Sequence, residues 1–388
     1  MSRPLDGLLV ADFSRVLAGP LATMHLADLG ATVIKVERPG AGDDTRAWGP
    51  PWTEHSSSYF ECVNRSKYSL ALDLAEPADQ ACARELAVRA DVLVENFRPG
   101  ALAQYGLDYD TVAARNRRIV YCSISGFGSG AGADRPGYDF LVQAVGGLMS
   151  ITGDRDGEPT KVGVALVDVL TGKDAVMGIL AALTARSRHG HGDHVEVDLL
   201  SSLLGGLVNQ AAAFLTTGRA PGRMGDQHPS IAPYETLQCA DGVLAVACGN
   251  DQQFRRLACV LGRPGLTEDA RFATNAARVA NRRRLVDALE TQLRTLPADE
   301  WERRLTAVGV PAGQVGDIAS AIEHATNLGL APLVDPGGGS PAQIRHPVRF
   351  TAAGVAPAGP PPGVGSDQEQ LLAWLGDPST TLQHPAER

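Results

Sequence analysis

One acidic residue stands in an otherwise uncharged stretch of the chain. Asp168 is the only charged residue of segment 162–171, which leads into an aliphatic run typical of a helix. A carboxylate removed from water without a partner costs several kcal/mol, so it is either hydrogen-bonded by backbone N–H groups or retained for chemistry. Asp168 or Thr171 could cap a helix near 170–187. Alternatively, Asp168 is a nucleophile that the positive end of the helix keeps ionised at neutral pH.

A glycine-rich segment, 126–132, has the superficial form of a dinucleotide-binding loop after a predicted strand. Pro136 stands where the phosphate-binding helix would already be running, and proline cannot continue that helix. The sequence therefore argues against NAD or FAD. Because glycine has no Cβ, we expect the segment to bring its backbone close to another ligand.

Other reactive residue types lack the spacing that their chemistry needs. The histidines of segment 189–194 are separated by glycines, which predicts a helix-to-strand turn rather than a metal site. Ser123 and Ser125 lie on a predicted strand with no evident partner histidine, and there is no Gly-x-Ser-x-Gly motif. The six cysteines have no CxxC spacing and are expected to be reduced thiols. We predict no metal site.

Composition narrows the class of protein. A chain of 388 residues is too long for one compact core, so two domains are expected. A net charge of −9 argues against nucleic acid as a partner. No run reaches the roughly 18 apolar residues of a membrane span, and the first residues lack the apolar core of a signal peptide. We expect a cytoplasmic protein that does not bind a membrane.

The first part of the chain alternates strand-like and helix-like segments, which predicts βαβ units around a parallel sheet. The segments are 8–13, 18–29, 32–37, 78–90, 91–97 and 118–127. We predict an α/β fold with a Rossmann-like large domain at 1–217, joined by the C-terminal 330–388. A Gly-rich, basic linker follows at 218–229. The nearly uncharged segment 201–217 predicts a helix that is buried or lies in a subunit interface.

A smaller α+β domain is expected at 230–329. Segments 235–239 and 243–247 predict a hairpin, and helical patterns follow at 251–262, 281–295 and 298–308.

Basic residues gather near the ends of the predicted strands. They are Lys35, Arg38, Arg65, Lys67 and Arg98. Open α/β sheets bind ligands outside the carboxyl ends of their strands, so these side chains could converge on a polyphosphate. The alternative is a set of solvated charges at loop edges.

Several segments together give the chain its resemblance to a known family. They are Asp12-Phe-Ser-Arg-Val-Leu-Ala-Gly-Pro20, segment 29–46, Asn64-Arg-Ser-Lys67, Val94-Glu-Asn-Phe-Arg-Pro-Gly100, Ser123-Ile-Ser-Gly-Phe-Gly128 and Tyr138-Asp139. In these segments the chain resembles the family III CoA-transferases of the CaiB/BaiF type. The resemblance implies a CoA-transferase that forms an interlocked, ring-like homodimer. It also implies that Asp168 is the nucleophile, which attacks an acyl-CoA and passes through an aspartyl anhydride and an aspartyl-CoA thioester.

The same resemblance implies roles for further residues. Tyr138 and Asp139 would lie near the thioester, and Gly249-Asn250 would correspond to a glycine loop of the small domain that covers the nucleophile. Coenzyme A would bind as substrate, with no permanently bound cofactor. Its implied contacts are Val16, Arg38, Leu72, Asn96, Phe97 and Arg98. A family lysine that contacts CoA falls at Pro136, so that contact is lost or taken by Arg135.

Departures from the family pattern bear on specificity. Leu17 replaces a glutamine of oxalate-using members, which argues against oxalate as acceptor. Tyr138 replaces a histidine of the racemases, and a tyrosine with a pKa near 10 is a poor base at neutral pH. An acyl-CoA racemase or isomerase, or a non-catalytic CoA-binding protein, remains the alternative.

Three further segments are similar to the succinyl-CoA:glutarate subgroup, whose substrates are dicarboxylates. They are segments 41–51, 228–234 and 249–254. Arg15 and Arg46, with His228, are the residues expected to bind such a substrate, because guanidinium groups bind carboxylates in bidentate geometry. The alternative for the two arginines is an ion pair with Asp43 or Asp44.

Overall fold

The computed structural model describes residues 2–377, 382, 384 and 385; the remaining positions of the expected C-terminal region 330–388 lie outside the described residues. The chain divides into two compact units. Unit 1 comprises Met1–Leu148, Lys161–Arg219 and Ala331–Arg388, and unit 2 comprises Met149–Thr160 and Ala220–Leu330. Segment 149–160, placed by sequence in the large domain, groups with unit 2. The Gly225 N–H donates to the Gly153 carbonyl at 3.0 Å, and Arg223 donates to the Gly157 carbonyl at 2.6 Å.

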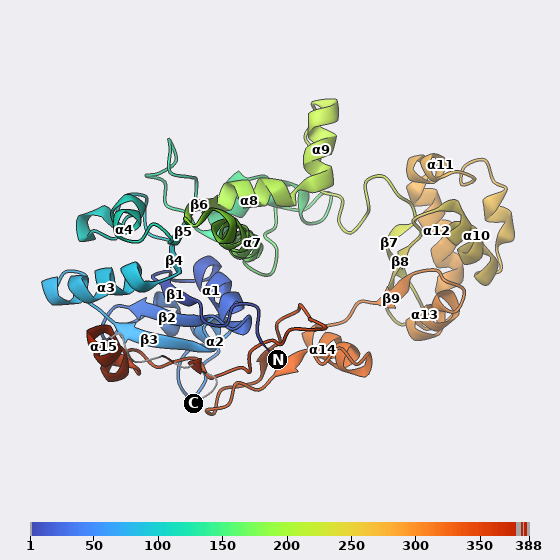
Figure 1. Cartoon of the computed structure of the whole chain (residues 1–388). Helices are drawn as coiled ribbons and strands as arrows, with labels where there is room; N and C mark the ends of the chain where they lie inside the picture. Colours follow the sequence, from blue (N-terminus) through green and yellow to red (C-terminus); the bar gives the residue numbers. More distant parts are fainter. Residues whose placement is uncertain (1, 378–381, 383, 386–388) are drawn as a thin grey trace. The chain divides into compact units, whose positions relative to one another are not determined.

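A six-stranded parallel sheet forms the centre of unit 1 (Figure 1). Its order is β3-β2-β1-β4-β5-β6. The strands are β1 (Leu9–Asp12), β2 (Thr32–Glu37), β3 (Lys67–Ala71), β4 (Val92–Glu95), β5 (Val120–Ser125) and β6 (Asp193–Asp198). This is the strand order of dinucleotide-binding folds, in which ligands bind where the order reverses, here between β1 and β4. The predicted Rossmann-like α/β fold is confirmed.

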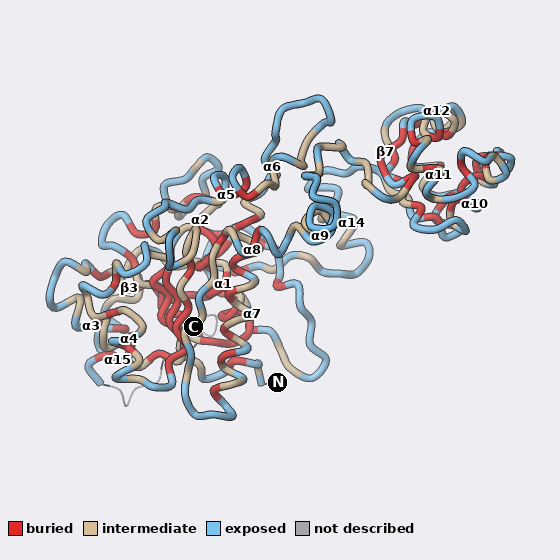
Figure 2. The backbone as a smooth tube through the Cα atoms, turned by 90° about the horizontal axis from the view of Figure 1, so that it is seen from above, coloured by how far each residue is buried: buried red, intermediate tan, exposed pale blue. Residues whose placement is uncertain are grey.

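Helices cover both faces of this sheet, and most residues of β1 to β5 are buried, whereas those of β6 are intermediate or exposed (Figure 2). One face packs on α1 (Ala18–Asp28), α7 (Leu166–His189) and α8 (Leu199–Gly206). The other packs on α3 (Pro77–Arg89), α4 (Tyr109–Arg115) and α15 (Gln368–Gly376). Alternate residues of a strand point to opposite faces, so Val10 joins the first core and Ala11 the second. The buried strands thereby fix the loops at their carboxyl ends.

The predicted helix at 201–217 is wrong in one respect, because the segment forms two helices. α8 ends at Gly206, and α9 (Val208–Thr217) continues at an angle of 79°. Consecutive glycines at 205 and 206 weaken the helix at this point. No single helix in the described chain is long and apolar enough to span a membrane, although α8 and α9 together pass that test by length and composition.

Short elements complete unit 1. They are η1 (Asp44–Ala47), α2 (Ser58–Glu61), η2 (Ala103–Tyr105), α5 (Asp139–Val145), β10 (Leu333–Val334) and β11 (Gln343–Ile344), and α6 (Leu148–Ile151) crosses into unit 2.

Unit 2 contains the predicted hairpin, β7 (Tyr234–Gln238) with β8 (Val243–Ala247), extended by β9 (Ala312–Gln314). Its helices are α10 (Asp251–Val260), η3 (Pro264–Thr267), α11 (Asn275–Ala280), α12 (Arg282–Leu293), α13 (Ala298–Thr306) and α14 (Ile318–Asn327). The three helical patterns predicted at 251–308 are confirmed as α10, α12 and α13. Leu237, Phe254 and Trp301 belong to one buried apolar core.

Candidate active site

Asp168 lies in the first turn of α7, but it does not cap the helix. The helix begins at Leu166, and its N-cap residue, Ala165, has no side chain that can accept a hydrogen bond. The hydroxyl of Thr171 donates to the Val167 carbonyl instead of capping. The interpretation of Asp168 or Thr171 as an N-cap is therefore wrong.

The cap is supplied by Asp139, from the start of α5. Its Oδ1 accepts the backbone N–H of Val167 at 2.8 Å and that of Asp168 at 3.3 Å. Its Oδ2 accepts the side-chain amide of the buried Gln143 at 2.7 Å. Asp139 thus satisfies N–H groups that every helix N-terminus leaves free.

The environment of Asp168 differs from the one predicted. Burial, together with the negative charge of Asp139, raises the pKa of Asp168 to about 7. No group of the described chain donates a hydrogen bond to its carboxylate. The prediction of a fully ionised carboxylate at neutral pH weighed only the helix terminus, and burial beside a second acid opposes that effect.

Asp168 lines a cavity of about 380 Å³ in unit 1. The walls come from the loops after β1, β4 and β5 and include six of the predicted residues: Arg15, Val16, Asn96, Phe97, Arg98 and Tyr138. A second cavity, of about 250 Å³, is lined by the predicted Arg38 and Leu72 and shares Arg15 and Phe97 with the first. The two cavities lie at the carboxyl ends of the strands, where α/β sheets bind ligands.

The loop after β1 is held rigidly between two polar side chains. Asn96 accepts the Arg15 N–H at 2.9 Å and donates to the Arg15 carbonyl at 2.7 Å. On the other side, the Val16 N–H donates to Asp43 at 3.2 Å, and Asp43 pairs with the buried Lys35 at 2.9 Å. Val16 has φ of 72°, a strained conformation for a β-branched residue that these contacts must maintain.

Five basic residues near the strand ends were expected to bind a polyphosphate or to be solvated, and for three of them both expectations are wrong. Lys35, Arg65 and Lys67 are buried and paired with Asp43, Asp28 and Asp12 respectively. They neither contact solvent nor remain available to a phosphate.

The other two basic residues, Arg38 and Arg98, are exposed at the cavities. They pair with the carboxylates of Asp44 and Asp134.

The two arginines expected to bind a dicarboxylate differ in availability. Arg46 makes two hydrogen bonds to Glu37, at 2.7 and 2.8 Å, and its guanidinium lies 3.6 Å from the centre of the Phe60 ring. Arg15 is half exposed, lines the cavity with Asp168, and has one contact to Asp44 at 3.3 Å. Arg135 lines the same cavity and lies over Phe127.

The glycine-rich loop brings backbone against backbone rather than only against a ligand. A Cβ built on Gly126 would lie 2.5 Å from the Cα of Gly137, and one on Gly132 would lie 2.1 Å from the Phe127 carbonyl oxygen. These glycines allow segment 126–137 to fold back and place Tyr138 in the cavity wall.

Three predicted residues belong to unit 2. Asn250 caps α10 by accepting the Gln253 N–H at 2.9 Å, and the Gly249 N–H donates to the Gln253 side chain at 2.8 Å. His228 accepts the Ser230 N–H and packs on the ring of Tyr234. Their roles at the nucleophile remain predictions.

Two further residues near Asp168, Tyr59 and Gln143, were not predicted from the sequence. Burial and the charge of Asp168 raise the pKa of Tyr59 to about 12. Gln143, which holds Asp139, is fully buried. Neither residue lies in a motif, and only the packing of α2 and α5 reveals them.

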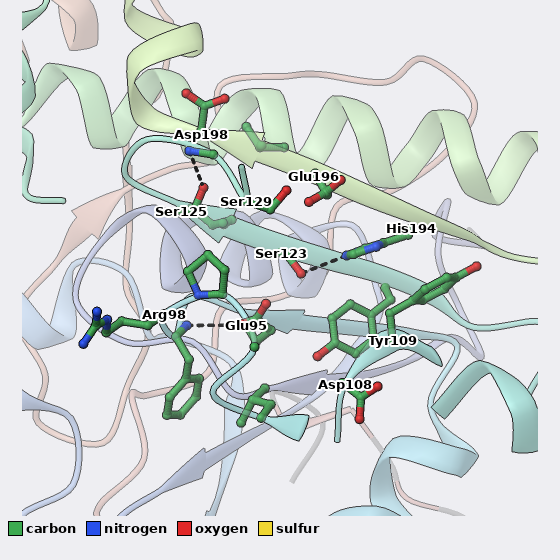
Figure 3. Close-up of a pocket in the computed structure, with 18 residues that line it drawn as sticks. Glu95, Arg98, Asp108, Tyr109, Ser123, Ser125, Ser129, His194, Glu196 and Asp198 are labelled. Carbon is green, nitrogen blue, oxygen red and sulfur yellow. Dashed lines mark hydrogen bonds between the residues drawn. The ribbon is translucent and has the colours of Figure 1, made fainter. Parts of the chain in front are cut away.

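Ser123 does have a partner histidine, contrary to expectation. Its hydroxyl lies 3.0 Å from His194 Nε2, because β6 pairs with β5 (Figure 3). The pair lines a cavity of about 330 Å³ together with Glu95, Asp108 and Glu196. Burial raises the pKa of Glu95 to about 7. Glu95, Asp108 and Glu196 disfavour a phosphate group in this cavity, although Phe97 and Arg98 line it as well as the cavity that contains Asp168.

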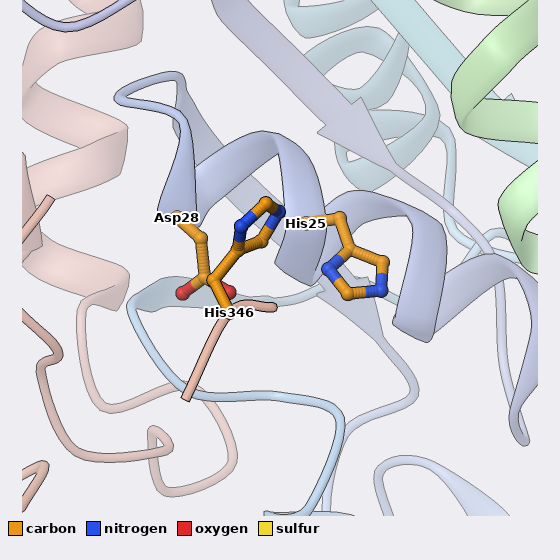
Figure 4. Close-up of side chains that lie close together, drawn as sticks. All are labelled: His25, Asp28 and His346. Carbon is orange, nitrogen blue, oxygen red and sulfur yellow. The ribbon is translucent and has the colours of Figure 1, made fainter. Parts of the chain in front are cut away.

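One group of three side chains in the described chain has the composition of a metal site: His25, Asp28 and His346 (Figure 4). Both oxygens of Asp28 accept hydrogen bonds from the buried Arg65, at 3.0 and 2.6 Å. Arg65 already neutralises the only carboxylate, so a divalent cation would add uncompensated charge to a buried site. This arrangement disfavours metal binding.

Comparison with known proteins gives a consistent result. A family model described as CoA-transferase family III matches residues 5–368. A protein of Agrobacterium fabrum named succinate–glutarate CoA-transferase is 43% identical over 388 residues, covering 96% of each chain. A protein of Acetobacter aceti named acetyl-CoA:oxalate CoA-transferase is 42% identical, covering 88% of this chain and 89% of its own.

A solved structure of a CaiB/BaiF family protein from Brucella suis matches with a TM-score of 0.87 and 43% identity. The match covers 97% of this chain and 100% of that one. The sequence and the fold thus lead to the same family, and the chain belongs to the family III CoA-transferases.

Proposed function

We propose that this protein moves CoA from succinyl-CoA to a second dicarboxylic acid, with glutarate as the favoured acceptor and Asp168 as the covalent nucleophile. The observation that carries the proposal is the position of Asp168, a partly buried carboxylate in the wall of the cavity that the β1 and β4 loops line. A relative that is 43% identical is named for succinate and glutarate.

The proposed chemistry conserves the energy of the thioester. The Asp168 carboxylate attacks the thioester carbonyl, which forms a mixed anhydride and releases CoA thiolate. The thiolate attacks the aspartyl carbonyl of the anhydride, giving an aspartyl-CoA thioester and free succinate. The acceptor carboxylate attacks that thioester, forming a second anhydride and thiolate. The thiolate then attacks the acceptor's carbonyl, which gives the new acyl-CoA and restores Asp168.

The cavities support this assignment. We assign the cavity with Arg38 and Leu72 to the nucleotide end of CoA and the cavity with Asp168 to the thioester end. Exposed guanidinium groups at Arg38, Arg98 and Arg135 provide partners for the CoA phosphates.

We assign Arg15 to the far carboxylate of the substrate. Arg15 keeps unused N–H donors in the cavity that Asp168 also lines, whereas Glu37 occupies the guanidinium of Arg46.

The oxyanions of the reaction need N–H donors, and the Gly249-Asn250 turn is the proposed source. The Gly249 N–H donates to Gln253 in this structure, so the assignment requires that bond to be exchanged for the oxyanion.

Trapping tests the covalent step directly. The protein would be incubated with succinyl-CoA, treated with hydroxylamine, and digested for peptide mass spectrometry. We expect a hydroxamate on Asp168 only, and none in Asp168→Asn. In steady-state assays with glutarate, Asp168→Asn should lose at least about a thousandfold in kcat, as when a nucleophile is removed from other covalent enzymes.

The same protein would be assayed with glutarate, oxalate and butyrate as acceptors. Turnover with oxalate but not glutarate would overturn the acceptor assignment and leave the nucleophile intact. Exchange of the substrate's α-proton in D₂O with an unmodified Asp168 would indicate a racemase. CoA binding without any turnover would indicate a binding protein.

A further inference from the structure

We propose that Gln143 is a positioning residue of this active site: its carboxamide holds the Asp139 carboxylate against the first turn of α7 and so sets the state of the nucleophile. The role in catalysis rests on the function proposed above. The contacts that define it are properties of unit 1 alone.

Gln143 uses both ends of its amide in a fully buried position. Its Nε2 donates to Asp139 Oδ2 at 2.7 Å and to the Val164 carbonyl at 3.4 Å. Its Oε1 accepts the Val162 N–H at 2.9 Å. A buried amide with partners at both ends has a single orientation, because a flip would place donor against donor.

Asp139 divides its two oxygens between two tasks. Oδ2 faces Gln143, while Oδ1 accepts the N–H groups of Val167 and Asp168. Gln143 lies four residues after Asp139 on α5, the spacing that places two side chains on one helix face. The hydrogen bond between Gln143 and Asp139, here called the clamp, therefore fixes which oxygen of Asp139 faces α7.

This arrangement does more than cap a helix. A serine or threonine at position 165 would satisfy the same N–H groups without any charge. A carboxylate from α5 instead places a second negative charge beside Asp168, and that charge favours the protonated nucleophile. The N–H donors hold the Asp139 carboxylate in place, so its charge stays next to the nucleophile.

Gln143 also bonds the segment in which the chain re-enters unit 1. The chain returns from unit 2 to unit 1 between Thr160 and Lys161, and Val162 is the first residue after that return to bond Gln143. Gln143 thus bonds both the returning segment, at Val162 and Val164, and the Asp139 carboxylate that caps α7.

Two substitutions with opposite expected effects test the proposal. Gln143→Met keeps the length but removes the donor, so the Asp139 carboxylate should turn away from Asp168. The midpoint of the pH profile for hydroxamate formation should then fall by about half a unit or more. Gln143→Glu adds an acid to the pair and should raise the midpoint. In Gln143→Met, kcat should fall at least about tenfold, with KM for succinyl-CoA within about threefold.

A second measurement does not depend on turnover. Hydrogen exchange of the peptide covering 162–171 should be at least about tenfold faster in Gln143→Met, because the Val162 and Val167 N–H groups lose ordered partners. The exposed Gln104, substituted as Gln104→Met, is the matched control and should leave exchange and pH midpoint unchanged.

The proposal would be overturned if both Gln143 variants had the pH midpoint of the wild type and the 162–171 peptide exchanged hydrogen at the wild-type rate. If the wild-type protein forms no hydroxamate, the proposed function fails, and exchange alone decides whether the clamp exists. If Gln143→Met does not fold, Gln143→Glu carries both measurements.

Discussion

The two carboxylates beside the N-terminus of α7 differ in their partners. Asp139 accepts N–H groups from Val167, Asp168 and Gln143, whereas burial next to Asp139 raises the pKa of Asp168 to about 7. In the proposed reaction only the carboxylate form of Asp168 can attack the thioester. Environment thus gives two residues of one type different properties: Asp139 caps the helix, and Asp168 is the proposed nucleophile.

The rate at which Asp168 is acylated is predicted to depend on pH. The rate of Asp168 acylation should rise about tenfold per pH unit below 7 and level off above it, because deprotonation creates the nucleophile. Asp139→Asn keeps an oxygen for the helix but loses the charge, so its midpoint should lie at lower pH. Quenched-flow measurement of the hydroxamate between pH 5 and 9 gives both curves. A pH-independent rate would contradict the assigned ionisation.

The raised pKa of Asp168 also makes the stability of the fold depend on pH. A carboxyl group whose pKa is higher in the folded state than in the unfolded chain binds protons more tightly when folded. Its contribution is therefore present at low pH and is lost as pH rises through about 7. Asp168→Asn, which cannot ionise, should melt at a higher temperature than wild type at pH 8 and nearer to it at pH 5, measured by calorimetry.

Arg15 is predicted to select dicarboxylates. A hydrogen bond to a charged group contributes about 1.5–3 kcal/mol, so Arg15→Gln should raise KM for glutarate by about 10- to 100-fold. Arg135→Gln removes a guanidinium from the same cavity and is the control. We expect it to raise KM for acyl-CoA more than KM for glutarate. Equal effects of both variants on glutarate would remove Arg15 from this role.

At the level of elements, the glycine-rich loop should tolerate no side chain at Gly126. In Gly126→Ala the new Cβ would lie 2.5 Å from backbone at Gly137, so the two segments must separate. Overpacking of this kind costs about 1–3 kcal/mol. Because Tyr138 and Asp139 follow directly, kcat should fall as well. Gly130→Ala meets nothing within 4 Å and is the matched control in denaturation and activity assays.

Sequence patterns identified β1, β2, β4 and β5 in unit 1 and α10, α12 and α13 in unit 2, because their apolar residues recur at regular intervals. They missed the break at Leu207, where hydrophobic residues continue through the bend. They also missed the grouping of segment 149–160 with unit 2, which depends on contacts such as Gly225 to Gly153 that leave no periodic pattern.

Residues that line the Asp168 cavity were predictable where they lie in contiguous segments, as do Asn96 and Tyr138, and Asp168 was predictable as a lone acid in an apolar run. The residues that support them were not. Lys35 and Asp43 are buried together, although charged residues are expected at the surface. Gln143 acts through partners 4 and 19 residues away. Such roles follow from packing between elements, which a single sequence does not encode in local spacing.

For the whole molecule, α9 predicts a partner chain. None of its described residues is buried, and Val208, Phe214 and Leu215 are 69%, 47% and 81% exposed. Apolar side chains gathered on one helix mark an interface. We expect a homodimer with a mass twice 40.7 kDa by light scattering. Leu215→Asp should lower the dimer fraction.

An interlocked dimer makes a stricter prediction than an ordinary one. Chains that thread through each other cannot exchange without unfolding, so tagged and untagged dimers mixed for days should form no hybrids. Hybrids should appear only after denaturation and refolding. Rapid exchange in native buffer would leave a dimer but exclude the interlocked form.

The excursion at 149–160 decides how this protein can be divided. The chain passes from one unit to the other four times, after residues 148, 160, 219 and 330. A gene fragment for 220–330 alone would omit segment 149–160. Gly225 and Arg223 donate hydrogen bonds to the Gly153 and Gly157 carbonyls of that segment. Anyone who wishes to express the smaller unit must therefore graft two separate stretches onto one polypeptide. A single pair of cuts would yield a truncated product with unpaired backbone groups where the missing segment belongs.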